Sequence, residues 1–144
     1  MTEVKQATCN DIELLIPALL ELRINRTADE LRNLLEIQFK SEEYQVYYIG
    51  DKKIAYAVAG VRTLNFLHSG KTMYIDDLVT HSAYRKLGYG GQLLDFIKQF
   101  VKDNKYDHLS LDSGFQRKDA YRLYLNSGFE VASLHFGRNV KELK

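Results

Sequence analysis

The sequence contains a single cysteine, Cys9, among its 144 residues, and it has no long apolar run. One cysteine excludes an internal disulfide, and such sparse use of cysteine is typical of proteins in the reducing cytosol. The apolar stretches are far shorter than a membrane span, and nothing in the sequence resembles a signal peptide. We therefore expect a cytoplasmic protein that does not bind a membrane.

The sequence also has almost no net charge. Its 20 basic and 19 acidic residues leave a formal charge of +1, which gives no field that would attract DNA, RNA or an anionic membrane. The four histidines, His68, His81, His108 and His135, lie far apart and have no partner cysteine, so we expect no metal site. The length suits one domain with its own core, spanning residues 1–144.

What the sequence does contain is a glycine-rich loop between an expected strand and an expected helix. Residues 74–79 have the aromatic and β-branched content of a strand. The apolar residues that follow repeat at the spacing of one helix face: Leu93, Leu94, Ile97, Phe100 and Val101. Gly88, Gly90 and Gly91 lie at the start of that helix, beside Arg85 and Lys86. Glycine lets a ligand approach the backbone N–H groups closely, so this loop predicts an anion site suited to phosphate.

Two common phosphate-binding loops do not match this spacing. A dinucleotide-binding loop requires a third glycine where Leu93 stands, and it follows the first strand of its unit. A nucleoside triphosphate loop is suggested by Gly70, Lys71 and Thr72, but its earlier glycine would fall on Asn65, and a strand follows it instead of a helix. The remaining pattern is Arg-x-x-Gly-x-Gly over residues 85–90.

The rest of the chain predicts a mixed α/β fold. Two capping boxes, Asn10 with Glu13 and Thr27 with Glu30, predict the starts of two helices that form a hairpin. Strands are expected at residues 4–7, 44–49, 54–64, 74–79, 108–111 and 129–136, and further helices at about 88–104 and at 119–126, before Gly128. The order β, α, α, β, β, β, α, β, α, β predicts a central mixed, mostly antiparallel sheet flanked by helices.

This order, together with two motifs, resembles the GNAT superfamily of N-acetyltransferases over nearly the whole chain, most weakly in its first 43 residues. The pattern at residues 85–90 is similar to the family's pyrophosphate-binding signature. Residues 120–129, Ala-Tyr-Arg-Leu-Tyr-Leu-Asn-Ser-Gly-Phe, are similar to its late segment. Arg117 marks a departure, because many relatives carry there an asparagine that contacts coenzyme A.

The resemblance implies that acetyl-CoA is the co-substrate. Backbone groups of three strand residues would bind the pantetheine arm as an added strand, at a splay between residues 74–79 and 108–111. The cofactor-binding residues implied in this way are Leu78, Val79, Thr80, Arg85, Lys86, Leu87, Gly88, Tyr89, Gly90 and Gly91, with Arg117 as a further candidate.

Two aspartates are the candidates for a general base. Acetyl transfer needs a neutral amine, and an amine with a pKa of about 10.4 must lose its proton to a nearby carboxylate. Asp76 and Asp77 lie within an apolar strand, where a carboxylate is costly unless it is solvated or paired, and alternation places them on opposite faces. By resemblance Asp76 matches the position of a general-base glutamate in some relatives, with Asp77 as the second choice. Ion pairs with neighbouring basic residues are the alternative role.

A tyrosine is the candidate general acid for the thiolate leaving group, whose pKa is about 8.5. Tyr124 matches the family's general acid. Tyr121, which lies on the same helix face, is the other tyrosine that could be mistaken for it. The alternative to an enzyme is a non-catalytic module that binds or senses an acyl-CoA, and the presence of both acid and base candidates favours the enzyme. We expect a monomer or homodimer. The acceptor is a small-molecule or peptide amine, with antibiotic, polyamine, amino-acid and protein acceptors all open.

Overall fold

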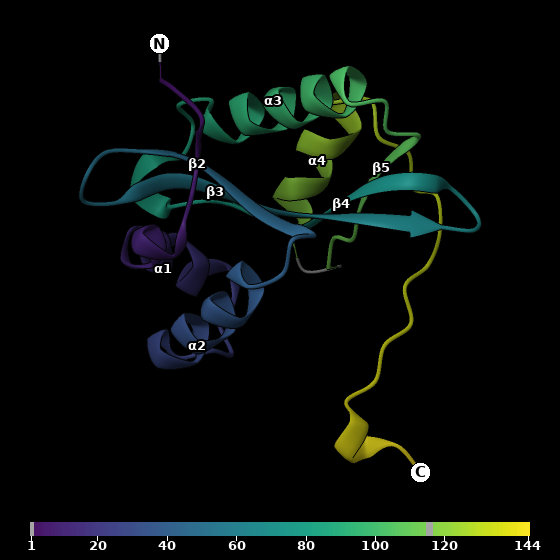
Figure 1. The fold of residues 1–144 in the computed structure, drawn as a ribbon, viewed down its shortest axis with the longest axis horizontal. Helices are drawn as coiled ribbons and strands as arrows, with labels where there is room; N and C mark the ends of the chain where they lie inside the picture. Colours follow the sequence, from purple (N-terminus) through teal and green to yellow (C-terminus); the bar gives the residue numbers. More distant parts are fainter. Residues whose placement is uncertain (1, 115–116) are drawn as a thin grey trace. The chain divides into compact units, whose positions relative to one another are not determined.

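The computed structural model describes residues 2–114 and 117–144, and it divides into two compact units, Met1–Leu111 and Asp112–Lys144 (Figure 1). The first unit contains β1 (Lys5–Gln6), η1 (Cys9–Asp11), α1 (Ile12–Leu22), α2 (Ala28–Phe39), β2 (Tyr44–Gly50), β3 (Ala55–Phe66), β4 (Gly70–Thr80), η2 (Ser82–Tyr84), α3 (Tyr89–Asp103) and β5 (His108–Leu111). The second contains α4 (Lys118–Asn126) and η3 (Val140–Glu142). None of the helices in these described ranges combines the length and the apolar character needed to cross a membrane.

The first unit is a five-stranded sheet with strand order β1-β2-β3-β4-β5. All neighbouring strands are antiparallel except β4 and β5, which are parallel because α3 makes the crossover between them. Figure 1 shows α1 and α2 on one face of the sheet and α3 on the other. The predicted fold class, a mixed and mostly antiparallel sheet flanked by helices, is confirmed.

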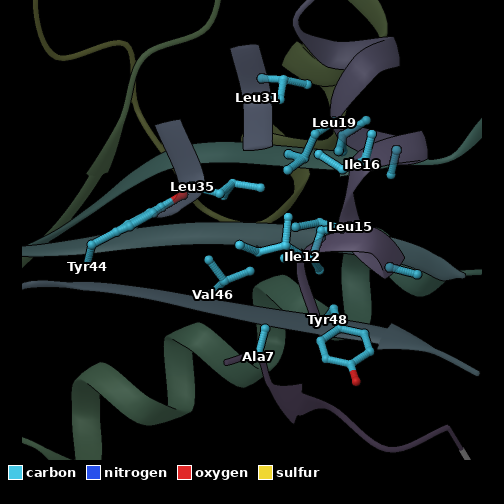
Figure 2. Packing of buried hydrophobic residues seen from close by; sticks show 14 residues of the cluster. Ala7, Ile12, Leu15, Ile16, Leu19, Leu31, Leu35, Tyr44, Val46 and Tyr48 are labelled. Atoms are coloured by element: carbon cyan, nitrogen blue, oxygen red, sulfur yellow. The ribbon is translucent and has the colours of Figure 1, made fainter. Parts of the chain in front are cut away.

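The alternation of side chains along β2 divides the core between these two faces. Tyr44, Val46 and Tyr48 pack with the buried leucines of α1 and α2, as Figure 2 shows. Tyr47 points to the other face, where its ring lies 4.9 Å from that of Phe96 on α3. The sheet is therefore buried on both sides, and each fully buried leucine contributes roughly 1.5–3 kcal/mol.

One of the two predicted capping boxes is confirmed and the other is wrong. The Thr27 side chain accepts a hydrogen bond from the Glu30 N–H, and Glu30 accepts one from the Thr27 N–H, as predicted. In front of α1 the box is formed instead by Thr8 and Asp11, so the predicted Asn10–Glu13 box is incorrect. The reason is that the 3-10 turn η1 precedes α1 and shifts the cap by two residues.

The second unit corrects the last predicted strand. Gly128 has the expected left-handed backbone, with φ of +89°, and α4 ends before it. Within the described residues 117–144, however, no strand is formed at residues 129–136, and Val131, Leu134 and Phe136 are exposed. A strand exists only where a neighbouring strand completes its backbone hydrogen bonds, so alternating apolar residues alone did not suffice. The element order is confirmed as far as α4.

Candidate active site

The last part of β4 forms an open edge of the sheet. β5 pairs only with residues 72–75 of β4, whereas β4 continues to Thr80. β3 pairs with this last part on one side, and in the described chain no strand pairs with it on the other. An unpaired edge presents backbone N–H and C=O groups that an extended ligand can bind. Leu78, Val79 and Thr80 lie on this edge.

The open edge leads directly into the glycine loop. Lys86 and Gly88 have left-handed backbone, with φ of 64° and 87°, and Gly88 is the N-cap of α3. Among the described residues no side chain caps this helix start, so the N–H groups of its first turn remain available to an anion. A Cβ added at Gly91 would have no heavy atom within 4 Å, so the space beside the first turn is open.

The cations of the loop lie at its surface. Arg85, Lys86 and Leu87 are all exposed, and Arg85 Nε donates a hydrogen bond of 3.2 Å to the Thr80 carbonyl. The predicted phosphate-binding residues and the open edge of β4 therefore form one continuous stretch of chain. Arg117 belongs to the second unit, where it is the N-cap of α4.

Glu21, on α1, fixes the start of this loop. Its carboxylate accepts hydrogen bonds from the backbone N–H of Ser82 at 2.9 Å and from the Ser82 hydroxyl at 3.0 Å. It also lies 3.2 Å from His81 Nε2 and 3.5 Å from Arg85 Nη2. Sequence reasoning missed Glu21, because a glutamate near the end of an amphipathic helix carries no signal of a partner 61 residues away.

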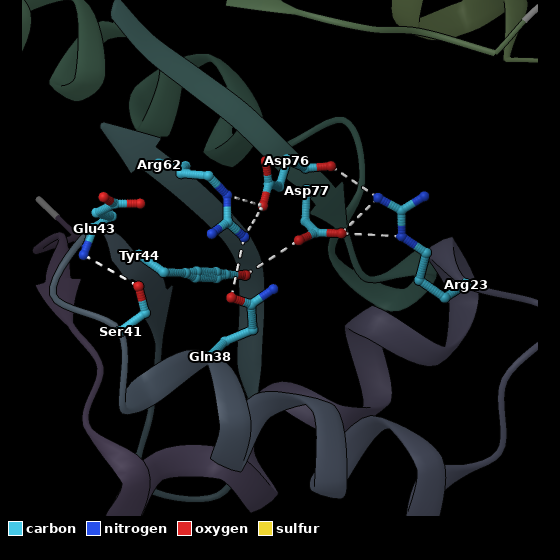
Figure 3. A network of polar contacts seen from close by, with 8 residues as sticks. All are labelled: Arg23, Gln38, Ser41, Glu43, Tyr44, Arg62, Asp76 and Asp77. Carbon is cyan, nitrogen blue, oxygen red and sulfur yellow. Dashed lines mark hydrogen bonds and ion pairs between the residues drawn. The ribbon is translucent and has the colours of Figure 1, made fainter. Parts of the chain in front are cut away.

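Asp76 and Asp77 lie at a β-bulge, which overturns the prediction that they face opposite sides of the sheet. Gly60 pairs with Asp77, and the next residue, Val61, pairs with Ile75, so Asp76 is an extra residue in β4. A bulge interrupts the alternation of side chains along a strand. Both carboxylates therefore belong to one polar network, on the face of the sheet that carries α1 and α2 (Figure 3).

Asp76 forms an ion pair with Arg62 on β3. Arg62 Nη2 and Nε donate to the same carboxylate oxygen, Oδ2, at 2.7 and 3.1 Å. The hydrogen bond to Asp76 raises the pKa of the Arg62 guanidinium above its usual value. Arg62 also donates to Gln38 Oε1 at 3.0 Å and lies 5.1 Å from the centre of the Tyr44 ring.

Asp77 is bound on both carboxylate oxygens. Arg23 Nη2 and Nε donate to Oδ1 at 2.6 and 3.0 Å, and the Tyr44 hydroxyl donates to Oδ2 at 3.1 Å. Burial, and next the charge of Asp77, raise the pKa of Tyr44 far above its ordinary value, so this hydroxyl stays protonated and can donate. Both aspartates are thus paired with arginines, which is the alternative role that the sequence analysis left open.

In the second unit, the two tyrosines of α4 differ in what their hydroxyls bind. The Tyr121 hydroxyl donates to the Gly114 carbonyl at 2.8 Å. The Tyr124 hydroxyl has no hydrogen-bond partner within the described residues, and its ring contacts Phe129 edge-on at 6.2 Å. Burial raises the pKa of Tyr124, and the charge of Arg117 lowers it by a smaller amount.

Three further residues of the polar network, Arg23, Tyr44 and Arg62, were missed by sequence reasoning. Arg62 carried a usable signal, because it is a charge inside an otherwise apolar strand that requires a partner. Arg23 and Tyr44 carried none, since each lies at the end of an element where polar residues are ordinary. In the described ranges, no group of three or more His, Cys, Asp or Glu residues could hold a metal ion.

Comparison with known proteins gives consistent matches. The model of the acetyltransferase (GNAT) family matches residues 13–129. The chain is 32% identical over 125 residues to the uncharacterized N-acetyltransferase YhdJ of Bacillus subtilis (strain 168), covering 86% of this chain and 88% of that protein.

Solved structures share the fold at low sequence identity. The aminoglycoside N-acetyltransferase AAC(6')-Iy in complex with CoA superposes with a TM-score of 0.82 at 13% identity, covering 97% of this chain and 95% of that one. A GNAT family acetyltransferase of Staphylococcus aureus subsp. aureus USA300_TCH1516 gives a TM-score of 0.78 at 19% identity, covering 96% and 98%.

Proposed function

Since the chain belongs to the acetyltransferase (GNAT) family, we propose that it transfers the acetyl group of acetyl-CoA directly to a primary amine of a small-molecule or peptide acceptor. One feature carries most weight for acetyl-CoA binding: the unpaired edge of β4 continues into the uncapped start of α3. The family match spans residues of both units, which supports treating residues 1–144 as one acetyltransferase domain.

The residues present fit a bound acetyl-CoA. Backbone groups of Leu78, Val79 and Thr80 would hold the pantetheine arm along the open edge, as an added strand does. The N–H groups of residues 88–91 and the exposed side chains of Arg85 and Lys86 would hold the pyrophosphate, since helix starts and cations both favour negative charge. The thioester supplies an activated acetyl group, so the protein's task is to position the acceptor and move protons.

We assign the general base to Asp76 in preference to Asp77. The Asp77 carboxylate is occupied on both oxygens by Arg23 and Tyr44, whereas Asp76 receives both bonds from Arg62 on Oδ2. Among the described residues nothing donates to Asp76 Oδ1, so this oxygen can accept a proton from the amine directly or through water. Removing that proton at pH 7 otherwise costs roughly 4 to 5 kcal/mol.

Tyr124 is the proposed general acid. Its raised pKa keeps the hydroxyl protonated at neutral pH, and this hydroxyl has no partner within the described chain. A thiolate with a pKa of about 8.5 accepts such a proton readily. Tyr121 is less suited, because its hydroxyl already donates to the Gly114 carbonyl.

The proposal is tested by release of free thiol from acetyl-CoA in the presence of a panel of primary amines, with mass spectrometry of the products. Transfer predicts a product heavier by one acetyl group and thiol release that depends on the amine. The alternative, a non-catalytic acyl-CoA-binding module, predicts acetyl-CoA binding by calorimetry without amine-dependent thiol release.

A further inference from the structure

Arg23, the residue that follows α1, has a guanidinium group that hydrogen bonds hold in place and that keeps one nitrogen, Nη1, free to donate within the described chain. Its Nε and Nη2 donate to Asp77 Oδ1, and Nη2 also donates to the Asp76 carbonyl at 2.8 Å. Its third nitrogen, Nη1, has no partner in the described part of the chain and carries no dashed line in Figure 3. The Arg23 side chain is 46% exposed, whereas Arg62, in the same network, is 22% exposed.

Such a guanidinium is prepared to bind an anion. Its orientation is already fixed by hydrogen bonds to Asp77 and Asp76, so little side-chain entropy is lost when Nη1 binds a ligand. The two N–H groups of Nη1 remain, and a carboxylate oxygen can accept a charge-assisted hydrogen bond from either. The other cation of this bend, Arg26, is 51% exposed and makes one ion pair, with Glu30 at 3.2 Å, so its guanidinium is held less firmly than that of Arg23.

The local charges disfavour a polycationic acceptor. Asp77 is neutralised by Arg23, and Asp76 by Arg62, so neither carboxylate adds an uncompensated negative charge to attract a second cation. A polyamine would instead meet the N–H donors of Arg23 Nη1, and an ammonium group cannot accept a hydrogen bond. A carboxylate at the same place would accept one.

We propose that Arg23 binds a carboxylate of the acceptor, and that the acceptor class is therefore small amines that also carry a carboxylate, as free amino acids do. This inference rests on the proposed acetyltransferase function and narrows its substrate. The guanidinium contacts the backbone carbonyl of Asp76, the proposed base. An acceptor held by Arg23 would thus have its carboxylate close to the residue that takes the proton from its amine.

The test compares amino acids with their own amides, which keep the amine and the size but lack the negative charge. The panel consists of the common L-amino acids, the matching amides and the matching amines without a carboxylate group. We expect kcat/KM to favour the acid over the amide by about tenfold or more for the accepted side chains. In Arg23→Gln this ratio should fall to about one, and Arg23→Lys should restore part of it.

The ratio of acid to amide is insensitive to partial loss of folded protein, which matters because Arg23→Gln also removes a partner of Asp77. Arg26→Gln is the matched control in the same bend and should leave the ratio unchanged. The inference would be overturned if the wild type used amides as well as it uses acids. It would also be overturned if Arg23→Gln kept the acid-to-amide ratio of the wild type. Transfer only to amines lacking a carboxylate would overturn the inference while supporting the acetyltransferase function, and transfer to no amine would count against both.

Discussion

The hydroxyl of Tyr44 on β2 donates a hydrogen bond to Asp77 on β4, across the strand that separates them. This bond passes over Gly60 of β3. A Cβ placed on Gly60 would lie 2.2 Å from the Tyr44 hydroxyl oxygen and 3.0 Å from Asp77 Oδ2. Glycine is therefore required here because two side chains meet above its backbone, and the polar network depends on that space.

The Tyr44 contact predicts a pH-dependent stability difference for Tyr44→Phe. The folded pKa of Tyr44 is raised above its ordinary value of 10.0, so its contribution to stability is fully present below about pH 10 and is lost as pH rises towards the folded pKa. At pH 7 the variant should be less stable by about 1.5–3 kcal/mol, the usual range for a hydrogen bond to a charged group.

By pH 11 the wild type should have lost about 1.4 kcal/mol of stability through this group relative to neutral pH, whereas phenylalanine loses none. The deficit of Tyr44→Phe, measured by denaturant unfolding at pH 7, 9 and 11, should therefore shrink with rising pH. A deficit that stays constant from pH 7 to 11 would mean that Tyr44 ionises alike in the folded and unfolded chains.

Replacing the proposed base should produce a pH-dependent loss of activity. Asp76→Asn should lower kcat/KM by about 10²- to 10⁴-fold at low pH, where little of the amine is neutral. The rate should recover as pH rises, because the amine then loses its proton without help. The measurement is a pH profile of acetyl transfer to a confirmed amine acceptor.

Asp77→Asn is the matched comparison, because it is the adjacent carboxylate and its oxygens are bound by Arg23 and Tyr44. It should affect stability more than the shape of the pH profile. If Asp77→Asn shows the pH-dependent loss and Asp76→Asn does not, the two roles are exchanged. If neither variant shows a pH-dependent loss of activity, neither carboxylate of this strand is the general base.

Tyr124→Phe should lower turnover with little change in binding. The substitution removes one hydroxyl that has no partner in the described chain and keeps the ring that contacts Phe129. We expect kcat to fall by about 10²- to 10⁴-fold with nearly constant KM, the signature of an interaction made only in the transition state.

Tyr121→Phe is the control on the same helix. It removes the hydrogen bond to the Gly114 carbonyl, so it should lower stability by about 1 kcal/mol and leave kcat nearly unchanged. Equal kcat values for wild type and Tyr124→Phe on a true amine acceptor would instead mean that the thiolate leaves unassisted or takes its proton from water.

The features that the sequence predicted well are those encoded locally. The Thr27 capping box, the glycine loop at residues 85–91 and the left-handed Gly128 depend on residues within a few positions of one another. The capping box in front of α1 was predicted at Asn10 instead of Thr8, because both residues have an acidic residue three positions later and only the turn η1 distinguishes them.

The features that the sequence did not predict depend on contacts between distant segments. The bulge at Asp76 arises from the register of β4 against Gly60 and Val61, which the sequence of β4 alone does not contain. The strand expected at residues 129–136 required a pairing partner, and its own alternation of apolar residues could not supply one. Glu21 and Arg23 likewise act on residues more than 50 positions away.

Calorimetric binding of acetyl-CoA to Gly90→Val is the most direct test of the central claim that the glycine loop holds the co-substrate's pyrophosphate. Valine at this position places a branched side chain where the phosphates would approach the first N–H groups of α3. Gln99→Val, at an exposed position of the same helix, is the matched control and should bind acetyl-CoA like the wild type. We predict that Gly90→Val weakens binding by about 100-fold or more, equivalent to about 2.8 kcal/mol. Unchanged acetyl-CoA affinity in folded Gly90→Val would contradict the account.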